Sequence, residues 1–87
     1  MNKKNRKTLE NIFSNPTKAD ILWSDIETLF EGLGAKLEER QGSRIGVKLN
    51  GQRAIFHRPH PNPTTDKGAV KAVRDFLKNA GVNYDEI

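Results

Sequence analysis

Two histidines lie three residues apart in the second half of the chain, and they are the side chains best suited to acid–base chemistry near neutral pH. His57 follows a short apolar run, and His60 lies between two prolines. A neutral imidazole can take the proton of an RNA 2′-hydroxyl; that oxygen then attacks the adjacent phosphorus while cations stabilise the transition state. The two residues therefore indicate RNA cleavage without a metal ion. The alternative is that His57 only contacts phosphate and His60 only caps a loop.

Composition excludes several other chemistries. The 87 residues contain no cysteine, which excludes disulfides, a thiolate nucleophile and a cysteine zinc site. A metal site built from His57, His60 and the more distant Asp66 is disfavoured, and no serine–histidine–aspartate arrangement can be assembled. The longest apolar runs are three residues, whereas a membrane helix needs about 20 and a signal peptide about 7–15. We expect a soluble cytoplasmic domain without a cofactor.

An Asn-Gly pair predicts the hairpin that positions His57. Asn50-Gly51 is typical of a two-residue type I′ loop, and counting outward from it pairs Arg44 with His57. One face of the hairpin then carries Ile45, Val47, Ala54 and Phe56, and the other carries Arg44, Lys48, Arg53 and His57. Lys48 facing Arg53 destabilises the sheet, which favours a functional explanation. Exposed lysine can also be simple protection of a sheet edge.

The rest of the chain predicts an α+β domain. Ser24 and Glu27 form a candidate capping box for the second helix, and Gly34 is placed to end it. Gly42-Ser43 predicts a turn between the first two strands, and the proline-rich segment 58–63 cannot be regular structure. The predicted order is α-α-β-β-β-α, with helices at 3–14, 24–33 and 67–80 and strands at 35–41, 44–49 and 52–57.

The charge is unevenly distributed along the chain. The net charge is +4, with +4 in residues 1–18, −4 in 19–35, +6 in 36–78 and −2 in the last residues. The closing helix aligns a basic ridge within an arc of about 60°. Together with the cations of the hairpin and Arg58, this ridge is expected to hold an RNA phosphate backbone rather than to read base edges. An ordinary solvated surface is the alternative. The ridge residues are Lys67, Lys71, Arg74 and Lys78.

Three features together resemble the HicA toxin family over about residues 20–82. They are the turn Gly42-Ser43 before a strand, the proline/histidine segment after the third strand, and a closing helix that ends Leu-Lys-Asn-Ala-Gly. The resemblance implies a double-stranded-RNA-binding-like fold, with a three-stranded antiparallel sheet packed on two helices. It also implies mRNA interferase activity and a HicB antitoxin that holds the toxin inactive. The basic helix and connector (1–19) and the acidic tail (83–87) lie outside this domain.

One position departs from the family pattern. The family usually places its catalytic histidine directly after the Gly-Ser turn, where this chain has Arg44. We therefore predict that His57 supplies the base from the neighbouring strand while Arg44 binds the scissile phosphate, with His60 as the second candidate base. The leading interpretation is an endoribonuclease toxin whose antitoxin covers Arg44 and His57. The alternatives are a non-catalytic double-stranded-RNA-binding module of the same fold and a protein-interaction domain for an acidic partner.

Overall fold

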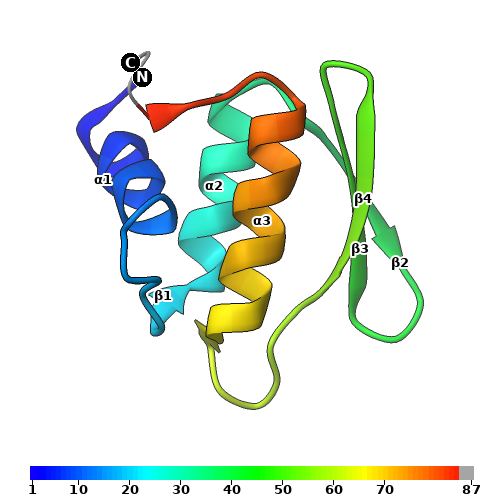
Figure 1. Cartoon of the computed structure of the whole chain (residues 1–87). Helices are drawn as coiled ribbons and strands as arrows, with labels where there is room; N and C mark the ends of the chain where they lie inside the picture. The colour runs from blue at the N-terminus through cyan, green and yellow to red at the C-terminus, as the bar shows by residue number, and fades with distance from the viewer. Residues whose placement is uncertain (85–87) are drawn as a thin grey trace.

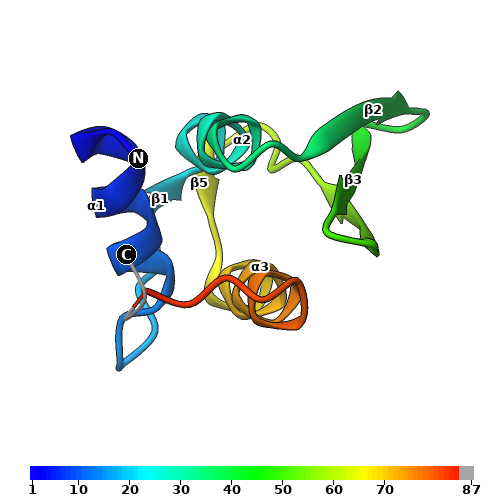
Figure 2. The same ribbon diagram turned by 90° about the horizontal axis from the view of Figure 1, so that it is seen from above.

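The helices and the main sheet form three successive layers, as Figure 1 shows. The computed structural model describes residues 1–84, so the acidic residues Asp85 and Glu86 of the predicted tail lie outside the described residues. The outer helix is α1 (Lys3–Ile12), the middle layer is α2 (Trp23–Gly32) and α3 (Lys67–Asn79), and the sheet is β2 (Lys36–Arg40), β3 (Arg44–Leu49) and β4 (Gln52–His57). The view from above shows the same order (Figure 2). The predicted α+β fold is confirmed.

A second, two-stranded sheet joins the starts of α2 and α3. It pairs β1 (Ile21–Leu22) with β5 (Thr64–Thr65) in antiparallel register. Just outside this pairing, the backbone N–H of Trp23 donates to the carbonyl of Pro63 at 3.0 Å. This sheet could not be predicted from the sequence, because two residues are too few to show a strand period.

The hairpin of β3 and β4 has the predicted register. Arg44 pairs with His57, and Lys48 pairs with Arg53. The loop residues Asn50 and Gly51 have φ angles of 49° and 81°, the positive values that a type I′ turn requires at both positions. The predicted pairing of two like charges in this hairpin is therefore present.

The connection from β2 to β3 is one residue longer than predicted. Arg40 pairs with Arg44, so the loop comprises residues 41–43, with positive φ at Gly42 and Ser43. Because side chains alternate along a strand, a shift of one residue exchanges the two faces. The longer loop therefore places alternate residues of β2 on the same face as Arg44 and Lys48. The pairs on that face are Lys36 with Lys48, Glu38 with Gly46, and Arg40 with Arg44.

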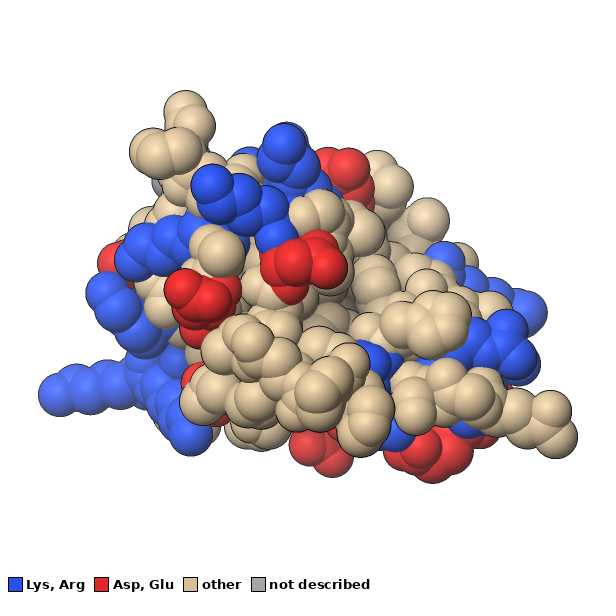
Figure 3. Space-filling view, turned by 90° about the horizontal axis from the view of Figure 1, so that it is seen from below, with Lys and Arg blue, Asp and Glu red and all other residues tan. Residues whose placement is uncertain are grey.

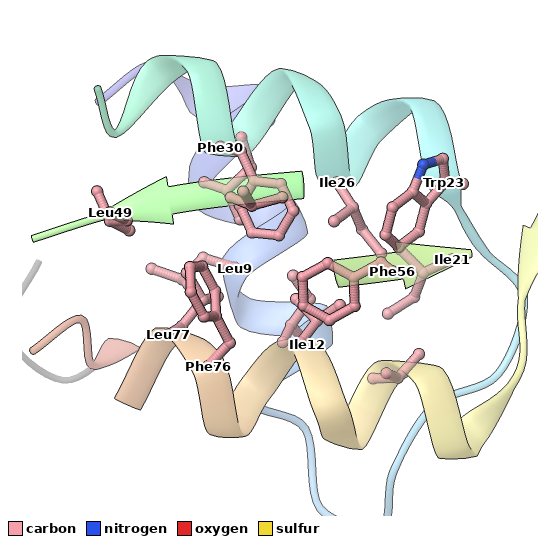
Figure 4. Packing of buried hydrophobic residues seen from close by; sticks show 14 of the residues in the cluster. Leu9, Ile12, Ile21, Trp23, Ile26, Phe30, Leu49, Phe56, Phe76 and Leu77 are labelled. Carbon is pink, nitrogen blue, oxygen red and sulfur yellow. The ribbon is translucent and has the colours of Figure 1, made fainter. Parts of the chain in front are cut away.

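One hydrophobic core joins all three layers, and Figure 4 shows its aromatic centre. The ring of Phe56 on β4 lies 6.0 Å from that of Phe30 on α2 and 5.9 Å from that of Phe76 on α3. Leu9 and Ile12 of α1 are fully buried in the same cluster. The N-terminal basic helix thus shares the core of the predicted 20–82 domain. In residues 1–84 no helix is long and apolar enough to cross a membrane.

The predicted capping box at Ser24 and Glu27 is wrong. The helix α2 begins at Trp23, and its N-cap residue, Leu22, has extended backbone and no side-chain cap. Ser24 is therefore already helical. The carboxylate of Glu27 is occupied elsewhere, because it accepts hydrogen bonds from the indole of Trp23 and from Arg58.

Candidate functional site

The candidate site is the outward face of the main sheet, which we define as the side of β2, β3 and β4 turned away from the helices. Core residues such as Ile45, Val47 and Phe56 are buried on the opposite side, and their strand neighbours point outward. The register arranges the outward residues in three rows across the sheet. The hairpin row is Lys36, Lys48 and Arg53; the central row is Glu38, Gly46 and Ile55; the loop row is Arg40, Arg44 and His57.

Arg44 and His57 are the two residues of the loop row that approach each other closely across β3 and β4. The backbone N–H of Arg58 donates to the carbonyl of Ser43 at 2.9 Å, so the next pair inward, Arg44 and His57, exchanges no backbone hydrogen bonds. Facing Cα atoms in such pairs are only about 4.5 Å apart. The guanidinium Nε of Arg44 donates to the carbonyl of Gln41 at 2.9 Å, while His57 is exposed. A fixed cation therefore lies beside a histidine open to solvent.

Two adjacent hollows lie on the outward face. The first, of about 490 Å³, lies at Gly46, and the second, of about 540 Å³, lies beside Arg44. Arg40 and Ile55 line both hollows. A Cβ atom at Gly46 would lie 2.8 Å from the Nε of Arg40, so the Arg40 side chain crosses the outward face over this glycine. The site therefore offers two connected recesses bordered by cations.

The second histidine is placed differently. His60 is exposed and lines a hollow of about 570 Å³ with Asp20, Asp66 and Lys67. His57 instead lines a groove of about 290 Å³ between β4 and α3. The structure thus does not bring the two candidate bases into one hollow. Within residues 1–84, no group of three histidine, aspartate or glutamate side chains is placed to hold a metal ion.

Arg58 is held by carboxylates on the helix side of the sheet. Its Nε donates to Glu27 at 2.7 Å, and its Nη1 and Nη2 each donate to Glu39 at 2.6 Å. The hydrogen bonds that Arg58 donates to Glu39, and then those to Glu27, raise the pKa of Arg58 further above its ordinary value. The same bonds from Arg58 lower the pKa of Glu39. Arg58, expected as an RNA contact, thus joins α2 to β2 and does not belong to the outward face.

The predicted basic ridge of α3 is only partly free, and it lies apart from the outward face. Arg74 is half-buried, and its Nη2 donates to the hydroxyl of Thr17 at 2.7 Å. Because α3 packs against the inner side of the sheet, its exposed residues cannot lie on the outward face. Seen from below, lysine and arginine lie in one group toward the helices, with acidic side chains among them, and in another toward the sheet, with mostly uncharged surface between the two groups (Figure 3). The exposed ridge residues are Lys67, Lys71 and Lys78.

Five residues of the outward face were not predicted: Gly46 and Ile55 of the hairpin, and three residues of β2. Lys36, Glu38 and Arg40 come from β2, whose register depends on the three-residue loop 41–43. Ile55 was passed over as part of an apolar run, although the alternation of the hairpin places it opposite Gly46. The alternation of the hairpin is enough to place Ile55 on the outward face. The β2 residues can be placed only when the length of the loop 41–43 is known.

Comparison with known proteins places the chain in a family. A protein of Sodalis glossinidius (strain morsitans) named uroporphyrinogen decarboxylase is 34% identical over 79 residues, which cover 84% of this chain and 22% of that protein. The chain thus spans about a fifth of that relative's length, and no solved structure gives a significant match. The family model of the HicA toxin of bacterial toxin–antitoxin systems matches residues 23–82, from the first residue of α2 to just beyond α3. The chain therefore belongs to the HicA toxin family.

Proposed function

We propose that this HicA-family toxin is a metal-independent endoribonuclease that binds mRNA on the outward face. The observation that carries this proposal is the pairing of Arg44 with His57 across neighbouring strands. A base and a phosphate-binding cation are the two groups that cleavage by a 2′-hydroxyl needs side by side. The remaining cations of the face supply sequence-independent attraction for the phosphate backbone. They are Lys36, Arg40, Lys48 and Arg53.

The proposed reaction needs no group beyond these residues and water. The neutral imidazole of His57 accepts the proton of the 2′-hydroxyl, and the 2′-oxygen forms a bond to the adjacent phosphorus. The guanidinium of Arg44 stabilises the negative charge on the phosphoryl oxygens. The bond from phosphorus to the 5′-oxygen breaks, and that oxygen takes a proton from water. The products are a 2′,3′-cyclic phosphate and a 5′-hydroxyl end, and the imidazolium returns its proton to solvent.

The pairing also explains how Arg44 can occupy the position where the family usually has its histidine. Neighbouring strands lie about 4.8 Å apart. A base on β4 opposite residue 44 therefore reaches nearly the same phosphate as a base at residue 44 itself. Exchange of the two roles across the ladder preserves the reacting geometry, with the cation on β3 and the imidazole on β4.

Cleavage of a labelled mRNA by the purified protein in EDTA tests the proposal. We expect cuts with the wild-type protein, loss of the cuts in His57→Ala, and retention in His60→Ala, with native circular dichroism for both variants. Loss of cleavage in His60→Ala alone would show that the base is His60, in the proline-rich segment. Absence of cleavage by the folded wild-type protein would contradict the enzymatic function.

We propose that a HicB-type antitoxin covers the outward face and so blocks Arg44 and His57. Acylation of histidine by diethyl pyrocarbonate tests this placement, because His60 lies in a separate hollow and provides an internal reference. In the complex, His57 should be protected and His60 should react as in the free toxin. Equal reactivity of His57 in the free and bound protein would place the antitoxin elsewhere.

A second candidate function is binding of double-stranded RNA without cleavage. The observation that favours it is Arg44 at the position of the usual catalytic histidine. This module would bind RNA with an affinity that falls steeply as salt rises, and it would leave the RNA intact in the assay above. The cleavage experiment therefore decides between the two functions.

A further inference from the structure

The central row of the outward face differs from the two rows beside it. It contains Glu38, Gly46 and Ile55 where the neighbouring rows contain cations and His57. The side chain of Ile55 is 54% exposed, the largest exposed fraction of any large apolar residue in the described chain. An exposed isoleucine and a carboxylate both weaken the attraction of a surface for phosphate. The central row therefore requires a second kind of contact.

The residues of this row border a recess that is apolar on one side and acidic on the other. Gly46 has no side chain, and the guanidinium of Arg40 lies over it, so Arg40 also borders the hollow of about 490 Å³. Ile55 on β4 borders it on one side, and Glu38 on β2 borders it on the other. With strands about 4.8 Å apart, the two walls are separated by about 9.6 Å. Beside the Arg40 guanidinium, the remaining space accommodates a flat ring with its face against Ile55 and its edge toward Glu38.

The carboxylate of Glu38 determines which ring fits best. It is 52% exposed and 3.7 Å from Arg40, so it faces the recess without being enclosed. An ionised carboxylate only accepts hydrogen bonds. Guanine presents two adjacent donors on its Watson–Crick edge, N1–H and the N2 amine. Adenine and cytosine place an acceptor nitrogen beside their single amine, and uracil flanks N3–H with two carbonyl oxygens.

We propose that the Gly46 hollow is a guanine-binding subsite that selects where this toxin cuts single-stranded RNA. The proposal rests on the ribonuclease function above and adds a substrate preference to it. The Watson–Crick edge of a base is free only in unpaired RNA. The cations of the hairpin row and the loop row hold the phosphates on either side. A guanine in the hollow directs the adjoining backbone toward the second hollow, which shares Arg40 and Ile55 with the first and is lined by Arg44, the cross-strand partner of His57.

Equilibrium binding of short oligoadenylates tests the subsite. The probes are of equal length, carry guanine, adenine, cytosine or uracil at the central position, and are 2′-O-methylated throughout so that they cannot be cleaved. Fluorescence anisotropy should give about tenfold tighter binding of the guanine probe to the wild-type protein, the discrimination that one bidentate contact supplies. Equal affinity for all four probes would overturn the proposal.

Two variants separate base recognition from charge. Glu38→Gln should reduce the guanine preference to about twofold or less and raise the affinity for the adenine probe, because one negative charge leaves the phosphate-binding face. Gly46→Val should abolish the preference without changing any charge, because its side chain fills the hollow and displaces the guanidinium of Arg40, whose Nε lies 2.8 Å from a Cβ at this position. The matched control is Glu31→Gln, which removes an exposed carboxylate from α2 and should keep the preference. A Glu38→Gln protein that keeps its guanine preference would contradict the assignment.

The outcomes distinguish this proposal from the function on which it rests. A protein that cleaves mRNA but binds the four probes equally keeps the ribonuclease function and loses the guanine subsite. A protein that neither binds nor cleaves RNA loses both. If Gly46→Val weakens antitoxin binding while the wild-type protein shows no base preference, the hollow is an antitoxin contact and the proposal is overturned.

Discussion

Arg44 and His57 lie opposite each other on β3 and β4 as a pair that exchanges no backbone hydrogen bonds, next to the bonded pair of Ser43 and Arg58. This is the type of pair in which facing side chains approach most closely. The pairing makes the two positions nearly interchangeable for any group that acts on a phosphate above them. A substitution at residue 44 can therefore be compensated from residue 57.

This relationship predicts that the base can be moved back across the ladder. His57→Ala should lower the cleavage rate by a factor of about 10² to 10⁴, the usual contribution of a general base. Adding Arg44→His to that variant should raise the cleavage rate at least about tenfold above that of His57→Ala alone. Single-turnover cleavage of a labelled mRNA measures both rates. The matched control is Lys48→His in the same background, four residues farther along β3 on the same outward face. Equal rates for the two double variants would show that position 44 has no special access to the phosphate.

The separation of the outward face from the α3 ridge predicts unequal effects on RNA binding. Replacing Lys48 and Arg53 by alanine should reduce the slope of log affinity against log salt by about 1.4, or about 0.7 for each lost phosphate contact on a single strand. Replacing Lys71 and Lys78 on α3 removes the same charge and should change the slope less. The measurement is RNA binding by anisotropy over a salt series. Equal changes in both variants would show that RNA extends around the molecule onto α3.

The shared core predicts that α1 is essential for the stability of the whole domain. Leu9 is fully buried against residues of the other helices, so Leu9→Ala should lower the free energy of unfolding by about 2–5 kcal/mol. Lys3→Ala at the exposed start of the same helix should change it by less than about 0.5 kcal/mol. Urea denaturation followed by circular dichroism measures both. A Leu9→Ala protein as stable as the wild type would show that α1 only rests on the surface.

The hairpin could be predicted from the sequence because two independent signals agree. The Asn50-Gly51 loop determines which residues pair, and the alternation of polar and apolar residues determines which face is buried. The strand β2 lacks the second signal, since four of its five residues are charged. Its face depends on whether the loop that follows it has two or three residues. Only the structure therefore shows that Glu38 belongs to the site.

The contacts of Arg58 show a second limit. Its partners Glu27 and Glu39 lie 31 and 19 residues away in the chain, and no local pattern marks them. The sequence groups Arg58, directly after β4, with the cations of the hairpin, whereas the fold brings two carboxylates to it. The predicted capping role of Glu27 is wrong for the same reason, because its carboxylate accepts hydrogen bonds from Arg58, a tertiary contact.

The ion-pair network of Arg58 predicts a specific dependence of stability on pH. The hydrogen bonds from Arg58 lower the pKa of Glu39 below its ordinary value of 4.5. A carboxylate whose pKa is lower in the folded state stabilises the fold above its unfolded pKa, and this contribution disappears as the pH falls through the folded pKa. Wild-type protein should therefore be more stable than Glu39→Gln near neutral pH, with the difference shrinking below about pH 4.5. Urea denaturation over a pH series measures it, and Glu31→Gln controls for the loss of one charge. A difference that stays constant into strong acid would show that ionised Glu39 does not stabilise the fold through Arg58.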